Sequence, residues 1–247
     1  MKIFRALRAK MIKNRKARNY LLYAIGEIFL VTVGILIALR VNSWNDYRKE
    51  RNLEKEMLQE IAADLNDDIE SLRNDERLNK GIIVSIEVIN SALKQQQQFH
   101  DSLGLYFGAV ALNPSYSLKE SGYENLKNRG VHIIENDSLR ELITTLYETV
   151  YPFLKEKQQK AEQATSGYFE PRYNEFFAHI RIDTLSRDIA RRYYYIPADF
   201  RAMAESTEFQ RLLDYSRLVK DNNLYDIEWT MQQIYATKDM VDAQLTD

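Results

Sequence analysis

The apolar residues of this chain gather first in one uninterrupted segment, Tyr20–Leu39, which carries a single charge, Glu27. A helix rises about 1.5 Å per residue, so roughly 20 apolar residues match a hydrocarbon core of about 30 Å. Helices buried in soluble domains are rarely as long and as apolar on every face. The pattern therefore predicts a transmembrane helix over residues 20–41, and a buried helix of a soluble domain is the weaker interpretation.

The charges on the two sides of this segment predict its orientation. Residues 1–19 hold eight Lys or Arg and no acid, whereas the residues after the segment mix both signs. Because the flank richer in Lys and Arg stays in the cytoplasm, we expect a cytoplasmic tail at residues 1–19 and an exported domain at residues 42–247. A cleaved signal peptide is the alternative, but its apolar region is usually shorter and ends in a small-x-small site.

The basic tail is expected to lie against the lipid bilayer. Lys and Arg beside a span are attracted to anionic lipids of the inner leaflet, and the tail contains no motif that reads a nucleic-acid groove. We therefore predict lipid contact and no nucleic-acid partner. The residues assigned to that contact are Lys10, Lys13, Arg15, Lys16 and Arg18.

One face of the apolar segment carries small residues and its only carboxylate. Residues at spacings of three or four share a helix face, and small residues let two helix backbones approach closely in a membrane. A carboxylate within a span is costly unless it is protonated or paired. We predict a helix–helix contact, with a second copy or with another membrane protein; the alternative is that Glu27 simply reaches the interface. The predicted contact residues are Ala24, Glu27, Val31, Gly34 and Ala38.

Composition narrows the nature of the exported part. The chain has a net charge of −2 and the first 19 residues carry +8, so the remainder is acidic and poorly suited to phosphate-rich partners. The absence of cysteine excludes a disulfide framework, a thiol nucleophile and a thiolate metal site. Only eight Gly and four Pro among many helix formers favour an all-α domain.

Helical periodicity continues after the apolar segment. Apolar residues recur every three or four positions over 53–72 and again over 82–93, with a polar stretch at 73–81 between them. We expect a break near Gly81 or an elongated helical bundle. Carboxylate pairs such as Asp67 and Asp68 are interpreted as parts of solvated helix faces.

The most distinctive exported stretch is SLKESGYENLKNRGVHIIENDSLR, residues 117–140. It predicts a short helix that ends at Gly130, an extended piece at Val131–Ile134, and a new helix with Ser138 and Glu141 at capping-box spacing. Pro152 should then kink or divide that helix. The residues assigned to this exported motif, without a role, are Tyr123, Glu124, Leu126 and Gly130.

Two motifs together carry a resemblance. The segment YAIGEIFLVTVGILIALRVNSWN and, about 80 residues later, YENLKNRGVHIIENDSLR resemble an uncharacterised single-span membrane family of Bacteroidota, classified as a domain of unknown function. Arg40 departs from that pattern, which expects an uncharged polar residue. The resemblance implies an inner-membrane anchor with a periplasmic domain, and it implies no activity.

No catalytic pattern stands out. The three histidines are widely separated, and neither a phosphate-binding glycine loop nor a nucleophile elbow occurs. We predict no enzyme activity, no metal and no cofactor. The predicted fold is all-α, with one transmembrane helix followed by an extracytoplasmic helical bundle. The predicted function is that of an anchored interaction or scaffold protein; the alternatives are a single-span sensor that binds a small ligand and signals through a membrane partner, and an envelope hydrolase.

Overall fold

The structure is a computed structural model that describes residues 15–95, 98–182 and 193–246. The chain divides into two compact units, Met1–Glu54 and Lys55–Asp247. Each unit is described by itself.

The long helix α2 (Arg15–Lys94) contains the apolar segment. The apolar side chains of this segment are exposed: Phe29 is 65 % and Leu30 is 70 % accessible. Within the described chain α2 is the one helix long and apolar enough to cross a membrane, by length and composition. Its position near the N-terminus fits a signal anchor and a signal sequence alike.

No break occurs near Gly81, so that alternative of the sequence prediction is wrong. The α-helix continues through the polar stretch 73–81 and ends at Lys94. Gly81 is exposed, and a Cβ atom there would meet nothing within 4 Å. The helix persists because Ile82, Ile86 and Ile89 are buried on its core face; burial of an apolar face outweighs the roughly 1 kcal/mol that one glycine costs.

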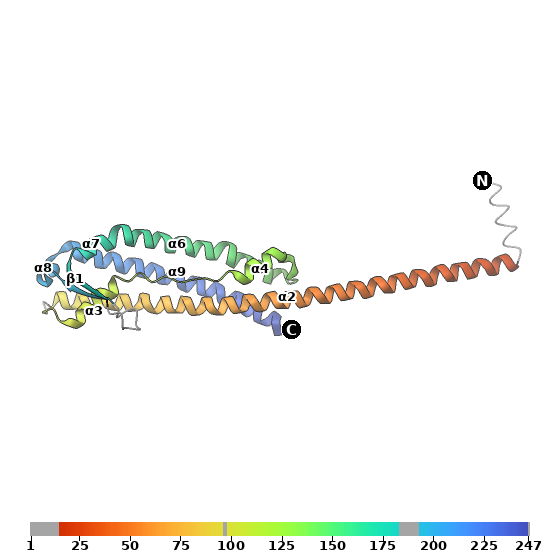
Figure 1. Ribbon diagram of the computed structural model, residues 1–247, viewed down its shortest axis with the longest axis horizontal. Helices are drawn as coiled ribbons and strands as arrows, with labels where there is room; N and C mark the ends of the chain where they lie inside the picture. The colour runs from red at the N-terminus through yellow and green to blue at the C-terminus, as the bar shows by residue number, and fades with distance from the viewer. Residues whose placement is uncertain (1–14, 96–97, 183–192, 247) are drawn as a thin grey trace. The chain divides into compact units, whose positions relative to one another are not determined.

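The second unit is a bundle of long helices, as predicted in coarse form. Helix α9 (Thr207–Thr246) lies beside α2 and runs in the opposite direction (Figure 1). Two side-chain pairs fix this antiparallel arrangement. Arg73 donates to the Tyr235 hydroxyl at 2.7 Å, and Arg217 pairs with Glu87 at 3.0 Å. The Ser206 hydroxyl caps α9 by accepting from the backbone N–H of Phe209 at 3.2 Å.

A third, interrupted helix completes the bundle. Its parts, in order, are α5 (Asp137–Thr145), the π-helical turn η2 (Leu146–Val150), α6 (Tyr151–Ala164), the π-helical turn η3 (Thr165–Phe169) and α7 (Glu170–Asn174). Each π-helical turn precedes a proline in the next helix, Pro152 in α6 and Pro171 in α7. Proline lacks an N–H and clashes with the preceding turn, and a widened turn accommodates both effects. The expected division at Pro152 is thus a local widening.

Shorter elements connect these helices. They are α3 (Asp101–Val110), α4 (Ser121–Arg129) and the 3₁₀ turn η1 (Val131–Ile133), with α8 (Phe200–Glu205) before α9. The extended piece predicted at 131–134 is therefore mostly a turn. The side chain of Asn136 caps α5 by accepting from the N–H groups of Ser138 and Leu139. The cap was expected at Ser138, two residues later.

A β-hairpin corrects the all-α prediction. Strand β1 (Phe177–Ile182) pairs antiparallel with β2 (Tyr193–Pro197). Aromatic and β-branched residues such as those of β2 favour strands when one face packs on other elements. Tyr195 is buried, and the Tyr194 hydroxyl donates to Asp101 of α3 at 3.0 Å. Contact with α3 thus stabilises a strand that was not predicted from the high content of helix-forming residues.

The apolar core has two parts. At the hairpin end, aromatic rings from several helices and both strands pack together around Phe107, Tyr173 and Phe209; the Tyr173 and Phe209 rings stack with centroids 5.8 Å apart. Toward the other end, buried Ile61, Leu65 and further aliphatic residues continue the core. Between the two parts, α2 carries buried polar residues, among them Asp75 and Asn79.

Candidate functional site

Helix α4 is positioned on α2 by two buried aspartates. The Asp64 carboxylate accepts from the backbone N–H of Gly122 at 2.7 Å and from the Ser121 hydroxyl at 3.0 Å. The Asp68 carboxylate accepts from the backbone N–H of Lys119 at 2.7 Å. The first N–H groups of a helix have no partners within it and carry partial positive charge. The aspartates of α2 supply those partners and so determine where α4 sits.

Gly122 permits this close approach. A Cβ atom at this position would lie 2.9 Å from the backbone nitrogen of Ile61 and 3.0 Å from the carbonyl carbon of Glu60. Backbone atoms cannot rotate away as a flexible side chain can. Any other residue would therefore push α4 off α2.

Tyr123 of the exported motif is part of the core. It is 3 % exposed, and its ring stacks on the ring of Tyr147 with centroids 4.6 Å apart. Its hydroxyl donates to Glu148 at 2.8 Å. Burial and Glu148 together raise the pKa of Tyr123 to about 12, so the residue acts as a neutral donor that joins α4 to η2.

The other motif residues divide between core, helix end and surface. Leu126 is fully buried. Gly130 has φ +106°, a conformation that favours glycine, and its N–H closes α4 by donating to the Leu126 carbonyl at 2.9 Å. Glu124 is exposed and lies 4.0 Å from Lys127. The structure thus brings Tyr123, Leu126 and Gly130 together in a docking role.

The interpretation of Asp67 and Asp68 as a solvated pair is wrong for Asp68. Asp67 is exposed, but Asp68 is fully buried and accepts from the Tyr151 hydroxyl at 2.5 Å. Burial raises the pKa of Asp68 to about 6, although the hydrogen bonds from Tyr151 and Lys119 oppose the rise. The Tyr147 hydroxyl is buried beside this pair and has no hydrogen-bond partner among the described residues.

Further along the bundle, α2 and α9 contribute further buried polar side chains, of which Asp75, Asn79, Lys220 and Thr230 are here called the polar belt. The Asn79 side chain donates to the Asp75 carbonyl at 2.8 Å. Burial raises the pKa of Asp75 to about 6 and lowers that of Lys220 to about 8, while each charge moderates the shift of the other. The belt therefore contains a buried carboxylate and a buried ammonium that attract each other.

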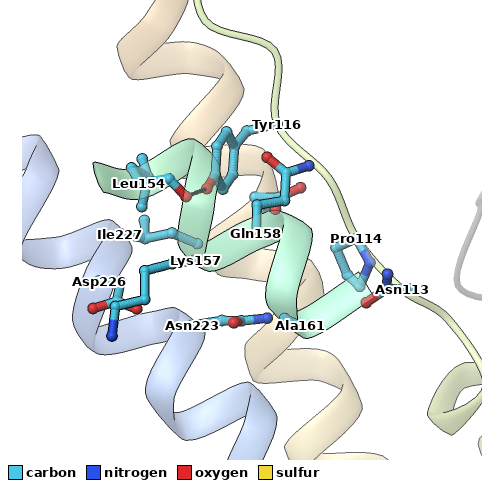
Figure 2. Close-up of a pocket in the computed structure, with 11 residues that line it drawn as sticks. Asn113, Pro114, Tyr116, Leu154, Lys157, Gln158, Ala161, Asn223, Asp226 and Ile227 are labelled. Atoms are coloured by element: carbon cyan, nitrogen blue, oxygen red, sulfur yellow. Dashed lines mark hydrogen bonds between the residues drawn. The ribbon is translucent and has the colours of Figure 1, made fainter. Parts of the chain in front are cut away.

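Figure 2 shows a small cavity, and Asp75 of the polar belt is one of the residues that line it. It has a volume of about 20 Å³ and is lined by Asp75, Asn113 and Tyr116 together with residues of α6 and α9. The Lys220 ammonium donates to the Asn113 side chain at 3.4 Å, and the Tyr116 hydroxyl donates to the Leu154 carbonyl at 2.7 Å. This volume suits one water molecule, so the cavity is a solvation site for the belt and not a ligand pocket.

Sequence reasoning missed the buried carboxylates, although one signal was present. Asp68 and Asp75 fall at spacings of three or four from Leu65 and Leu72, on the same helix face. A charged residue that interrupts an apolar stripe is either at its edge or buried with a partner. The partners, Tyr151 and Lys220, are distant in the sequence and could not be paired from it.

An open concave surface formed by η2, α6 and α9 is here called the aromatic hollow. It has a volume of about 340 Å³ and is lined by Thr149, Phe153, Tyr225, Asp226 and Trp229. Thr149 and Phe153 come from η2 and α6, and the other three come from α9. All three aromatic side chains are exposed, Tyr225 to 71 %.

The predicted membrane contact lies entirely on the first unit. Ala24 is half-buried, whereas Glu27, Val31 and Gly34 are exposed, as is Ala38. A Cβ atom at Gly34 would meet nothing within 4 Å. The helix face is therefore open to a neighbour, and the contact itself stays a prediction.

The predicted lipid contact lies at the beginning of the chain. Lys10 and Lys13 lie outside the described residues, Arg15 and Lys16 belong to the first turn of α2, and Arg18 is exposed. Over residues 15–95, 98–182 and 193–246, no three His, Asp or Glu side chains gather closely enough to hold a metal ion. The absence of a metal or cofactor stays a prediction.

Comparison with known proteins identifies a family to which the chain belongs. The model of a family of unknown function, DUF6090, matches residues 27–196. The match begins within the apolar segment and ends in β2. No curated protein and no solved structure matches the chain.

Proposed function

Since the chain belongs to the DUF6090 family, which has no assigned function, we propose from its structure that it is a membrane-anchored scaffold. Residues 20–41 anchor it in the inner membrane, the tail contacts the inner leaflet, and the helical domain extends into the periplasm and binds protein partners. The chain is not an enzyme in this proposal. The observation that carries it is the contrast between an exposed apolar helix and a domain in which the cavities lined by Asp75 and by Lys220 have volumes of about 20 and 10 Å³, room for no more than one water each.

The interior of the domain supports a binding role over a catalytic one. Asp64 and Asp68 are occupied by α4 and Tyr151. The Asp75 carboxylate faces Lys220 and room for one water. Catalysis requires acid and base groups that a substrate can reach, and these carboxylates are used for internal contacts.

The proposed partner contact is the stripe on the apolar helix. Gly34 and Ala38 form a small-x-x-x-small pair, and such pairs let helices pack at close distance in lipid. Exposure of Glu27 on the same face adds a group that requires a protonated state or a polar partner in a membrane. The partner is a second copy of the chain or another membrane protein.

The test is the substitution Gly34→Leu, with Gly26→Leu as the matched control. Neither glycine has an atom within 4 Å of an added Cβ, but only Gly34 is on the stripe. We expect Gly34→Leu to reduce the size of the complex extracted in mild detergent and run on a native gel, while Gly26→Leu leaves it unchanged. Equal behaviour of the two variants would remove the stripe from the proposal.

A second candidate is a ligand sensor. The aromatic hollow favours it because that surface has the size of a small-molecule site. A screen for ligand-dependent changes in the melting temperature of the full chain distinguishes this candidate from a scaffold.

A further inference from the structure

The aromatic hollow is an open corner formed by two of its rings. The rings of Phe153 and Trp229 have centroids 5.7 Å apart and planes inclined by 74°. Tyr225 stands one helical turn before Trp229 on the same face of α9. Two walls nearly at right angles, with a third ring beside them, surround a round group better than a planar one.

The hollow contains one acidic group and lies on an acidic unit. Asp226 lines the hollow and is partly buried. Residues 55–247 contain 22 Lys or Arg and 32 Asp or Glu, so this unit attracts cations over a long range. The Phe153 ring already attracts a cation, because the Lys157 ammonium lies 5.2 Å from its centroid, although Lys157 itself lines the small cavity and not the hollow.

These features distinguish between kinds of ligand. A sugar ring stacks on a flat aromatic surface, which a 74° corner does not provide. An apolar helix from a partner would bury the Asp226 carboxylate further without adding a charge to the one that Lys157 already provides, which is unfavourable. An alkylated ammonium group satisfies both features, since its positive, rounded surface suits several ring faces and one carboxylate.

We propose that the aromatic hollow binds the cationic head of a small alkylated ammonium compound, with Phe153, Tyr225 and Trp229 around the methyl groups and Asp226 beside the charge. Thr149 lies at the rim, where its hydroxyl meets the polar remainder of the ligand. The site is independent of the membrane stripe, so failure of the anchoring proposal leaves it standing.

The experiment uses the full chain in a maltoside detergent, which has no ammonium group, and choline as the probe. The chain has two tryptophans, so Trp44→Phe leaves Trp229 as the sole indole. We expect choline to change the Trp229 fluorescence saturably. The neutral tert-butyl analogue of choline has the same shape without the charge and should bind about fivefold more weakly or not at all.

Two variants test the contributions of charge and ring. Asp226→Asn should weaken choline binding about fivefold, whereas Glu228→Gln, which removes an exposed carboxylate two residues away, should not change it. Phe153→Leu should weaken binding similarly, with circular dichroism to confirm the fold. If Phe153→Leu unfolds the domain, the Asp226 and Glu228 pair decides the result.

The source of the ligand is distinguished by vesicles. If choline binds and phosphatidylcholine vesicles compete while phosphatidylglycerol vesicles do not, the natural ligand is a lipid headgroup; if neither competes, it is a free solute. Both results support the proposal. Equal binding of choline and its neutral analogue, no saturable binding of choline, or binding of N-acetylglucosamine in its place would overturn it.

Discussion

At the scale of single residues, the absence of a side chain at Gly122 determines how closely α4 packs on α2. Its added Cβ would contact the backbone of Ile61 and Glu60 at 3.0 Å or less, while Asp64 holds the Gly122 N–H at 2.7 Å. The hydrogen bond pulls α4 toward α2, and only glycine lets it come that close. Short-range repulsion and a charge-assisted hydrogen bond therefore act on the same residue.

We expect Gly122→Ala to lower the free energy of unfolding by about 1–3 kcal/mol, the usual cost of forcing an extra group into a packed contact. Chemical denaturation of the detergent-solubilised chain measures it. Gly81→Ala is the matched control, because that glycine is in mid-helix with open space around it, and it should raise stability by about 0.5–1 kcal/mol. If both substitutions stabilise the chain, the close approach described here is wrong.

At the scale of elements, the antiparallel pair α2 and α9 combines an apolar interface with the polar belt. Burial of Asp75 and Lys220 costs free energy, and their mutual attraction offsets part of it. Isoleucine and leucine flank the belt on both helices, as at Leu72 and Ile82 on α2. Such an arrangement specifies the register of the two helices because a shift of one turn would separate the charges.

The belt should make stability depend on pH. The folded-state pKa of Asp75 is about 6 against an ordinary value of 3.8, so between these values the folded chain binds more protons than the unfolded chain. The contribution of Asp75 to stability therefore rises as pH falls from 7 to 5, by about 1 kcal/mol. Thermal melts at the two pH values measure this gain.

Substitutions assign this gain to the buried group. In Asp75→Asn the gain between pH 7 and 5 should shrink by about 1 kcal/mol, whatever the change in stability at either pH. Asp67→Asn removes an exposed carboxylate of the same helix and should leave the gain unchanged. A pH dependence identical in both variants would show that Asp75 is not the group responsible.

At the scale of the whole molecule, the distribution of charge and apolar residues divides the chain into parts with different surroundings. Most apolar residues of the first unit are exposed, whereas those of the second unit form a core. In water, an exposed apolar stretch of this length favours aggregation or insertion into a bilayer. The proposed anchoring follows from that difference.

Anchoring and orientation are testable together. We expect alkaline phosphatase fused to the C-terminus to be active in growing cells, because the eight Lys and Arg before the segment retain the tail in the cytoplasm. The chain should stay in the membrane fraction after an alkaline carbonate wash, with Met1 or the next residue at its N-terminus. A soluble, shortened chain would identify the apolar segment as a cleaved signal sequence.

Much of this structure follows from local patterns. The apolar stripe predicts the helical character of α2 up to its end near Lys94, and Gly130 predicts the end of α4. These features depend on residues within one or two turns of each other, so the order of amino acids determines them.

Only the tertiary structure decided the rest. Strand β2 requires the surface of α3, and Asp68 and Asp75 are buried because Tyr151 and Lys220, distant in sequence, come to face them. The aromatic hollow likewise joins residues of η2 and α6 to residues of α9 that are about 70 positions away. Burial, pairing and cavity shape depend on which elements pack together. The free energy of that packing depends on contacts between residues distant in the sequence.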